Sequence, residues 1–253
     1  MRASLIALAF LAVTLPLMPL QWLLAKVRSP LARKLPHFYH RLVCRLLGVS
    51  LHVEGKVPAS GLLAANHVSW LDIPVLSAVL PVTFVAKKEV GRWPFFGSLA
   101  RLQGSVFVDR ESRQSTGPSR SEMASRLKAG EAVVLFPEGT SHTGRGVKPF
   151  KSTFFGAVEH HAVAVIPVTL IYQQHHGLPL TLRQRPRLAW YGDMELLPHL
   201  WQLLKGGPVA VTILFHDELR AEAFGNRKAL AREAERHVKA GLSQKLHARP
   251  KIG

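Results

Sequence analysis

The hydrophobic pattern divides the chain into an apolar N-terminal segment and a longer part in which apolar and polar stretches alternate. Residues 3–25 contain no charged side chain, and about 20 apolar residues are enough for a helix to cross a bilayer. Pro16 and Pro19 lie inside this segment and lack the helical N–H, so we expect an interrupted helix that spans the membrane or enters one leaflet. A cleaved signal peptide is the alternative, but no small-x-small site precedes Lys26.

Basic residues follow the apolar segment and predict its orientation. Lys26, Arg28, Arg33 and Lys34 form the more basic flank, which places the rest of the chain in the cytoplasm by the positive-inside rule. We therefore expect a membrane-associated protein whose main domain lies on the cytoplasmic side of the inner membrane.

A second N-terminal helix is predicted from an amphipathic pattern. Its apolar side comprises Leu35, Phe38, Leu42, Val43, Leu46 and Leu47, and its basic side comprises Lys34, His37, Arg41 and Arg45. Such a helix suits an anionic membrane surface, and a helix that packs on the core of the following domain is the alternative. The chain is thus divided into an anchor with an interfacial helix, residues 1–49, and one globular domain, residues 50–253.

Short apolar runs in the second part predict a sheet. The runs are residues 61–65, 82–86, 105–109, 132–136, 163–170, 188–191 and 209–215. Helices are expected at 121–128 and 151–161, a polar loop at 114–121, and a solvated terminal helix at 227–244. Because several runs are apolar throughout, we expect an α/β fold whose mixed, largely parallel sheet is covered by helices on both faces.

The charge indicates an anionic partner. The 33 Lys and Arg residues exceed the 16 Asp and Glu residues by 17, and residues 1–53 contain seven basic and no acidic side chains. Residues 227–253 hold eight basic side chains against two acidic ones, and basic ends of this kind favour a membrane surface over nucleic acid, since aromatic and basic residues are seldom interleaved. Cys44 is the sole cysteine, which excludes an intramolecular disulfide.

Polar residues follow the run 61–65 and suggest a general base. His67 in a loop and Asp72 near the start of a helix are able to meet, and Asp72 would then orient the imidazole and leave its other nitrogen free. The alternative is that Asp72 caps the helix.

Three further clusters follow other apolar runs. Arg110 ends the run 105–109, where it is placed either to bind a phosphate or to form a surface ion pair. Glu138, Gly139 and Thr140 follow the run 132–136 and offer polar groups beside a glycine, or form a plain turn. Pro167 predicts an edge or a break in its strand, because proline cannot donate to a ladder. Loops after parallel strands converge on one sheet edge, so these clusters are expected to form one site.

Four sequence blocks, NHVSWLD, GSVFVDR, FPEGTS and VIPV, occur in this order over roughly residues 50–215. The chain resembles the PlsC-type glycerolipid acyltransferases, the 1-acyl-sn-glycerol-3-phosphate acyltransferase family. The resemblance implies a membrane-bound enzyme that moves an acyl group from acyl-CoA or acyl carrier protein to a lysolipid hydroxyl, with residues 50–253 as the catalytic domain. It implies His67 as the base and Asp72 as its orienting partner, with no metal or other cofactor. The substrate-binding residues that it implies are Asn66, Lys88, Arg110, Glu138, Gly139, Thr140 and Ser141.

Ser141 departs from the family pattern, in which many enzymes that act on lysophosphatidic acid carry Arg at this place. We expect 1-acyl-sn-glycerol-3-phosphate as the acceptor and phosphatidic acid as the product, with another cation holding the phosphate. The alternative acceptor is another lysolipid such as lyso-ornithine lipid, because residues 148–152 and 190–194 resemble a bacterial branch that uses it.

Two functions of a different class are also compatible with this fold, namely a non-catalytic membrane-docking protein and a lysophospholipase. A docking protein is opposed by the intact His67, Asp72 and Glu138. A lysophospholipase is opposed by the lack of a Gly-x-Ser-x-Gly motif, which leaves no serine nucleophile indicated.

Overall fold

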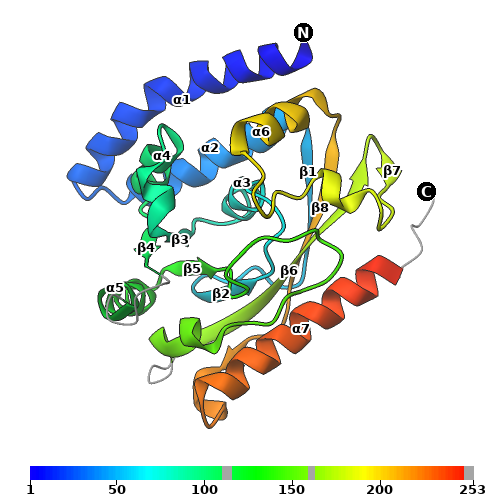
Figure 1. The fold of residues 1–253 in the computed structure, drawn as a ribbon. Coiled ribbons are helices and arrows are strands. Elements are labelled where there is room, and N and C mark those ends of the chain that lie inside the picture. Colours follow the sequence, from blue (N-terminus) through cyan, green and yellow to red (C-terminus); the bar gives the residue numbers. More distant parts are fainter. Residues whose placement is uncertain (110–115, 159–162, 248–253) are drawn as a thin grey trace.

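The computed structural model describes residues 1–109, 116–158 and 163–247, and shows one mixed sheet between two helical layers (Figure 1). The α-helices are α1 (Arg2–Lys26), α2 (Leu31–Leu47), α3 (Asp72–Ser77), α4 (Phe96–Leu102), α5 (Thr116–Lys128), α6 (Leu196–Lys205) and α7 (Arg227–His247). The strands are β1 (Val49–Glu54), β2 (Gly61–Ala65), β3 (Thr83–Lys87), β4 (Val106–Val108), β5 (Ala132–Leu135), β6 (Ala164–His175), β7 (Leu178–Pro179), β8 (Val209–Phe215) and β9 (Leu219–Arg220). Short 3₁₀ helices occupy Lys88–Arg92, Ser152–Ala157, Arg185–Arg187 and Ala221–Ala223.

The strand order is β1-β8-β6-β2-β5-β3-β4, with β7 and β9 added along β6. Neighbours from β6 to β4 are parallel, β8 runs antiparallel to β6, and β1 is parallel to β8. The predicted mixed, largely parallel sheet is therefore confirmed. Strand β1 was not predicted. The strand predicted at 188–191 is wrong, because that segment follows a 3₁₀ helix and forms a loop.

Strand β2 shows how the sheet is covered on both faces. All five of its residues are buried. Leu63 and Ala65 belong to the core beneath α1, α2, α3 and α6, whereas Leu62 and Ala64 belong to the core beneath α5 and α7. Burial on both faces explains why this run is apolar without alternation.

Pro167 lies within the sheet, not at an edge, so the predicted edge position is wrong. It pairs with Ala64 of β2, and its carbonyl accepts the N–H of His216. The N–H and C=O of one strand residue point to the same side, so the missing donor faces residues 216–218, between β8 and β9. The neighbouring strands do not pair with β6 at these residues. The missing N–H of Pro167 therefore costs no ladder hydrogen bond, and β6 continues without a break.

The N-terminal helix is continuous through Pro16 and Pro19, so the predicted interruption is wrong. Its tertiary contacts support it along its length. The Thr14 hydroxyl lies 2.8 Å from the Tyr39 hydroxyl of α2, and the Gln21 amide donates to the carbonyls of Ala32 and Leu102. Helix α1 is long and apolar enough to cross a membrane.

The predicted boundary between residues 49 and 50 falls inside β1, and the N-terminal helices share a core with the sheet. Helix α2 buries Val43, Cys44 and Leu47 in the core and leaves Phe38 exposed, so it packs on the following domain, and its contact with a membrane stays a prediction. Gly48 adopts a left-handed conformation that ends α2 and turns the chain directly into β1. The division of the chain into anchor and catalytic domain stays a prediction.

Two other local predictions are corrected by packing. Helix α7 is not solvated all round, because Leu230, Ala234, Val238 and Leu242 are buried in the core on one face of the sheet. It lies on the opposite face from α1, so the basic ends of the chain form separate surfaces (Figure 1). Part of the predicted loop 114–121 belongs to α5, and the helix predicted from residue 151 is a 3₁₀ helix, Ser152–Ala157, in the described part of that segment.

Candidate active site

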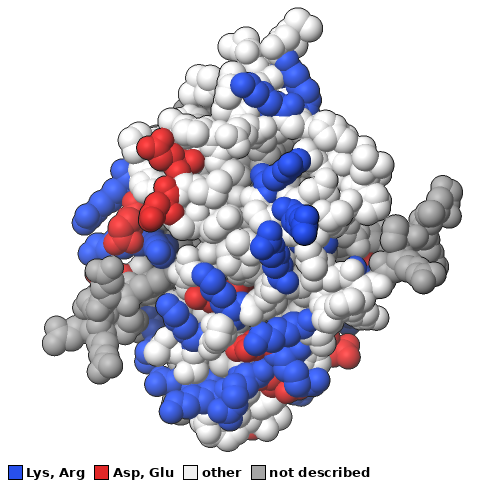
Figure 2. Space-filling view, turned by 45° about the vertical axis from the view of Figure 1, so that its right-hand side comes forward, with Lys and Arg blue, Asp and Glu red and all other residues white. Residues whose placement is uncertain are grey.

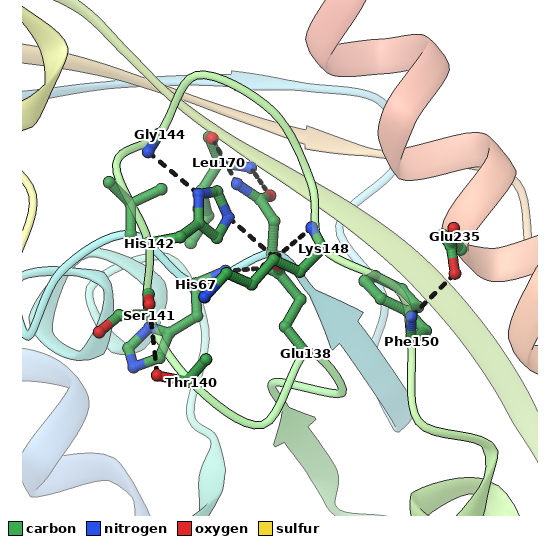
Figure 3. Close-up of polar contacts among 12 residues, drawn as sticks. His67, Glu138, Thr140, Ser141, His142, Gly144, Lys148, Phe150, Leu170 and Glu235 are labelled. Carbon is green, nitrogen blue, oxygen red and sulfur yellow. Dashed lines mark hydrogen bonds and ion pairs between the residues drawn. The ribbon is translucent and has the colours of Figure 1, made fainter. Parts of the chain in front are cut away.

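The loops after β2 and β5 meet at one sheet edge because these strands are parallel neighbours. The loop after β2 carries His67, and the loop after β5 carries Glu138. The backbone N–H of His67 donates to Glu138 Oε1 over 2.7 Å, and the N–H of His142 donates to the His67 carbonyl (Figure 3). The two clusters that the sequence places 71 residues apart therefore form one site.

His67 and Asp72 form the predicted pair. His67 Nδ1 lies 2.8 Å from Asp72 Oδ2, and the same oxygen accepts the N–H groups of Val68 and Ser69. A carboxylate only accepts hydrogen bonds, so Nδ1 carries the proton and the lone pair of Nε2 is free. Asp72 holds the loop that precedes it and does not cap the following helix, whose N-cap is Leu71.

Two residues that the sequence did not single out support this pair. The Phe136 ring stacks on the His67 imidazole, with ring centroids 4.1 Å apart. The Tyr172 hydroxyl of β6 donates to Asp72 Oδ1 over 2.6 Å. Burial raises the pKa of Tyr172 well above its ordinary value, and the nearby Asp72 carboxylate raises it further. Phe136 begins the FPEGTS block, whereas Tyr172 has no local sequence signal, because its contact joins residues 100 positions apart.

Glu138 organises the loop after β5. Its Oε2 atom accepts the backbone N–H of Lys148 over 2.6 Å and lies 2.9 Å from His142 Nε2 (Figure 3). His142 Nδ1 accepts the N–H of Gly144, so the proton of the neutral ring is on Nε2, which lies at ion-pair distance from the carboxylate without a hydrogen bond to it. Glu138 is 2% exposed, and its contacts hold the loops after β2 and β5 together.

A cavity of about 410 Å³ opens beside His67 and extends between the N-terminal helices and α4. Most of its wall is apolar and comes from α1, α2, α3, β3, α4 and α6. The predicted substrate residues that line it are Gly139, Thr140 and Ser141, and Lys87 also lines it. Gly139 has φ +78°, and a Cβ atom there would lie 2.9 Å from Lys151 Nζ, so this tight turn favours glycine. A long apolar cavity beside a free imidazole nitrogen fits an acyl chain whose reactive end lies at His67.

The remaining predicted residues lie elsewhere. Asn66 is fully buried and exchanges two hydrogen bonds with the backbone of Leu170, so it anchors the loop to β6. Lys88 Nζ lies 3.7 Å from Asp109 and does not line the cavity, whereas its neighbour Lys87 does. Arg110 lies outside the described residues. The Ser141 hydroxyl lines the cavity and donates to the carbonyl of Trp190.

The described residues contain no group of three or more His, Cys, Asp or Glu side chains placed to hold a metal ion. The chemistry that the described geometry offers is proton transfer by His67 at the mouth of an apolar cavity. Such an arrangement serves the attack of a hydroxyl oxygen on an acyl carbonyl.

Comparisons with known proteins agree with this chemistry. An acyltransferase family model matches residues 49–171. The chain is 44% identical to a lyso-ornithine lipid O-acyltransferase of Brucella abortus, over 98% of this chain and 96% of that protein. It is 33% identical to a 1-acyl-sn-glycerol-3-phosphate acyltransferase of Neisseria gonorrhoeae, over 72% of this chain and 69% of that protein.

The fold is also that of a solved structure, the 1-acyl-sn-glycerophosphate acyltransferase PlsC from Thermotoga maritima. The two structures superpose with a TM-score of 0.71 over 99% of this chain and 98% of that one, at 21% identity. The α/β fold with its N-terminal helices therefore has an experimental counterpart. The chain belongs to the acyltransferase family. It is an O-acyltransferase, as the sequence resemblance implied.

Proposed function

We propose that the protein transfers an acyl group from a thioester to the free hydroxyl of a lysolipid, and that this lysolipid is lyso-ornithine lipid. The observation that carries the proposal is the 44% identity to a lyso-ornithine lipid O-acyltransferase along nearly the whole of both chains. A second such enzyme, from Rhizobium meliloti, is 41% identical over 98% of this chain.

The reaction follows from the free Nε2 atom of His67. This nitrogen removes the proton from the acceptor hydroxyl while the hydroxyl oxygen attacks the thioester carbonyl carbon. The carbon–sulfur bond then breaks, and the departing thiolate takes the proton from the imidazolium. The products are an ester and a free thiol, and the acyl donor is acyl-CoA or acyl carrier protein. Asp72 keeps the imidazole in the tautomer that this cycle needs.

The wall beside Ser141 supports a phosphate-free acceptor. Its hydroxyl donates to the Trp190 carbonyl, and the Trp190 N–H donates to the Val68 carbonyl over 3.0 Å. Residues 190–192 are thereby fastened over the cavity next to the base. Many relatives that act on lysophosphatidic acid carry a cation at the position of Ser141. In this chain the position holds a neutral hydroxyl that is hydrogen-bonded to Trp190.

Lysophosphatidic acid is the second candidate, and it is the acceptor that the sequence favoured. Lys87 lines the cavity at the end of β3 and offers a cation for a phosphate. On the face drawn in Figure 2, Lys and Arg side chains are more widespread than acidic ones, which favours anionic ligands in general.

A comparison of acceptors tests the proposal. Purified protein is given labelled acyl-CoA or acyl carrier protein with lyso-ornithine lipid or lysophosphatidic acid, and kcat/KM is measured for each. We expect the wild type to prefer lyso-ornithine lipid. Ser141→Arg should raise the relative use of lysophosphatidic acid, because Arg forms paired, charge-assisted hydrogen bonds with phosphate.

Ser141→Ala is the matched control, since it also loses the contact with Trp190 but adds no charge. It should lower kcat/KM for both acceptors without changing their ratio. A wild-type preference for lysophosphatidic acid would contradict the proposed acceptor, and release of free fatty acid without a new diacyl lipid would contradict transferase activity.

For the membrane we propose that α1 lies along one leaflet, on the cytoplasmic side. Arg2 donates to the Leu204 carbonyl at one end of the helix, and Gln21 binds α2 and α4 near the other, so its length is fastened to the catalytic body. The opposite side of α1 exposes apolar residues, including Leu8 (64%) and Leu15 (55%). A helix that is bound to the catalytic domain at both ends cannot span a bilayer while that domain remains outside the membrane.

Membrane fractionation tests this placement. Leu8→Glu combined with Leu15→Glu should move most of the protein from the membrane pellet to the soluble fraction, because charge on the inserted side opposes burial in lipid. Leu178→Glu changes an exposed leucine on β7 and is the control that should stay in the pellet. A double variant that resists high salt and carbonate extraction would contradict the placement.

A further inference from the structure

Strand β6 brings a tyrosine hydroxyl to the carboxylate behind the base. The Tyr172 hydroxyl donates to Asp72 Oδ1 over 2.6 Å, and the two residues are 3% and 0% exposed. Tyr172 lies outside the four sequence blocks and does not line the cavity. It therefore reaches the reaction through Asp72 and not through substrate.

The loop around His67 holds one of the two Asp72 oxygens. Oδ2 receives His67 Nδ1 and the N–H groups of Val68 and Ser69, all from residues within five positions of Asp72. Three donors on one atom fix that atom, but the carboxylate remains able to turn about it, because this side-chain torsion is intrinsically broad. A donor on Oδ1 fixes the second oxygen and with it the plane of the carboxylate.

Tyr172 is itself firmly held. Its carbonyl accepts a hydrogen bond from Arg185 Nη1 over 2.9 Å, and its backbone pairs with Val211 of β8. Burial and the Asp72 charge raise the pKa of its hydroxyl well above the ordinary value, so the group stays protonated and remains a donor. The donor that fixes Oδ1 is thus supplied by the centre of the sheet.

We propose that Tyr172 is a positioning residue for the acyl transfer. It holds the Asp72 carboxylate in the plane that keeps His67 Nδ1 protonated and Nε2 directed at the acceptor hydroxyl. The inference rests on the proposed role of His67 as the base. It predicts an effect on turnover that passes entirely through Asp72.

The test is a double-mutant cycle between Tyr172→Phe and Asp72→Asn, measured as kcat and KM with the better of the two acceptors. Tyr172→Phe keeps the ring and should lower kcat about ten- to a hundredfold with KM unchanged within about twofold, as expected for one charge-assisted hydrogen bond. In the Asp72→Asn background the same change should cost less than about twofold, because the carboxylate that Tyr172 orients is gone. Equal costs in both backgrounds, or an effect confined to KM, would overturn the proposal.

Thr169→Val is the matched structural control. Thr169 is a fully buried hydroxyl on the same strand, and it contacts His216 and not Asp72. Its loss should lower thermal stability and leave kcat within about twofold of wild type. His67→Ala run in parallel separates the hypotheses. If it is inactive while Tyr172→Phe is fully active, only the role of Tyr172 fails, and if it is active, the proposed base fails.

A spectroscopic measurement covers the case in which Tyr172→Phe does not fold. The chain has three tyrosines, so Cζ-labelled tyrosine gives three NMR signals, assigned with Tyr39→Phe and Tyr191→Phe. In Asp72→Asn the Tyr172 signal should shift and the other two should not. An unshifted Tyr172 signal would contradict the contact on which the proposal rests.

Discussion

Two histidine–carboxylate pairs meet at the site, and they differ in a way that explains which one performs chemistry. His67 with Asp72 and His142 with Glu138 both lie in loops after parallel neighbouring strands, and their nitrogen–oxygen distances are 2.8 and 2.9 Å. In the first pair the imidazole is 18% exposed and keeps Nε2 free at the cavity. In the second it is 7% exposed, and both of its nitrogens face groups of the same loop.

The comparison teaches that a carboxylate beside a histidine does not by itself make a base. A base needs one nitrogen oriented by the carboxylate and a second nitrogen that reaches substrate. His142 uses its second nitrogen to accept the Gly144 N–H, and the resulting fold of the loop holds the backbone of His67. One pair is therefore expected to control turnover, and the other to control stability and loop position.

The largest effect is expected from His67→Ala. Loss of the general base should lower kcat by about 10²- to 10⁴-fold. The protein should remain folded, because the removed side chain faces the cavity on one side. Turnover with labelled acyl donor and circular dichroism measure the two properties. Near-normal turnover would break the comparison, since the exposed pair would then not be the base.

A smaller effect on turnover is expected from His142→Gln. The buried Glu138 carboxylate loses a partner, so we expect the free energy of unfolding to fall by about 1–3 kcal/mol. The kcat value should fall less than about tenfold, because His67 keeps its own carboxylate. Urea unfolding and steady-state kinetics measure these quantities. A loss of turnover as deep as that of His67→Ala, at unchanged stability, would show that His142 takes part in the reaction.

The smallest effect is expected on the pH dependence of stability and comes from His216, which lies on the other face of the sheet. Burial, together with the nearby His237 and against an opposing effect of Asp217, lowers the pKa of His216 to about 4. Between an ordinary pKa of about 6.5 and this value the unfolded chain binds more protons than the folded one, so stability falls as the pH falls through that window. We expect this group to contribute about 2 kcal/mol or less of the decline.

The His216→Gln variant tests this dependence. Unfolding by urea between pH 7 and 4 should show a shallower decline than in the wild type. The decline should not vanish, because burial also lowers the pKa of His40 to about 4, with the same sign. An unchanged slope would mean that folding does not lower the pKa of His216.

The sequence predicted the strands that are buried on both faces, because a run that is apolar throughout carries its own signal. It did not predict β1, which includes the exposed His52 and the half-buried Glu54. The sequence indicated Lys88 as a substrate-binding residue, but the structure places Lys87 at the cavity. Which of two adjacent lysines lines the cavity depends on where β3 ends. Prolines 16, 19 and 167 misled the prediction, because α1 continues through the first two and β6 through the third.

The sequence by itself determined the His67–Asp72 pair, because the two residues are only five positions apart, one in the loop after β2 and one at the start of α3. It also determined the acyltransferase family through the order of its blocks. Only the tertiary structure decided what surrounds the pair. Tyr172 reaches Asp72 from 100 positions away, and Ser141 reaches Trp190 from 49, since both contacts depend on which strands and loops become neighbours at the sheet edge. Strand order is set by burial summed over the whole core, and no local pattern of residues encodes it.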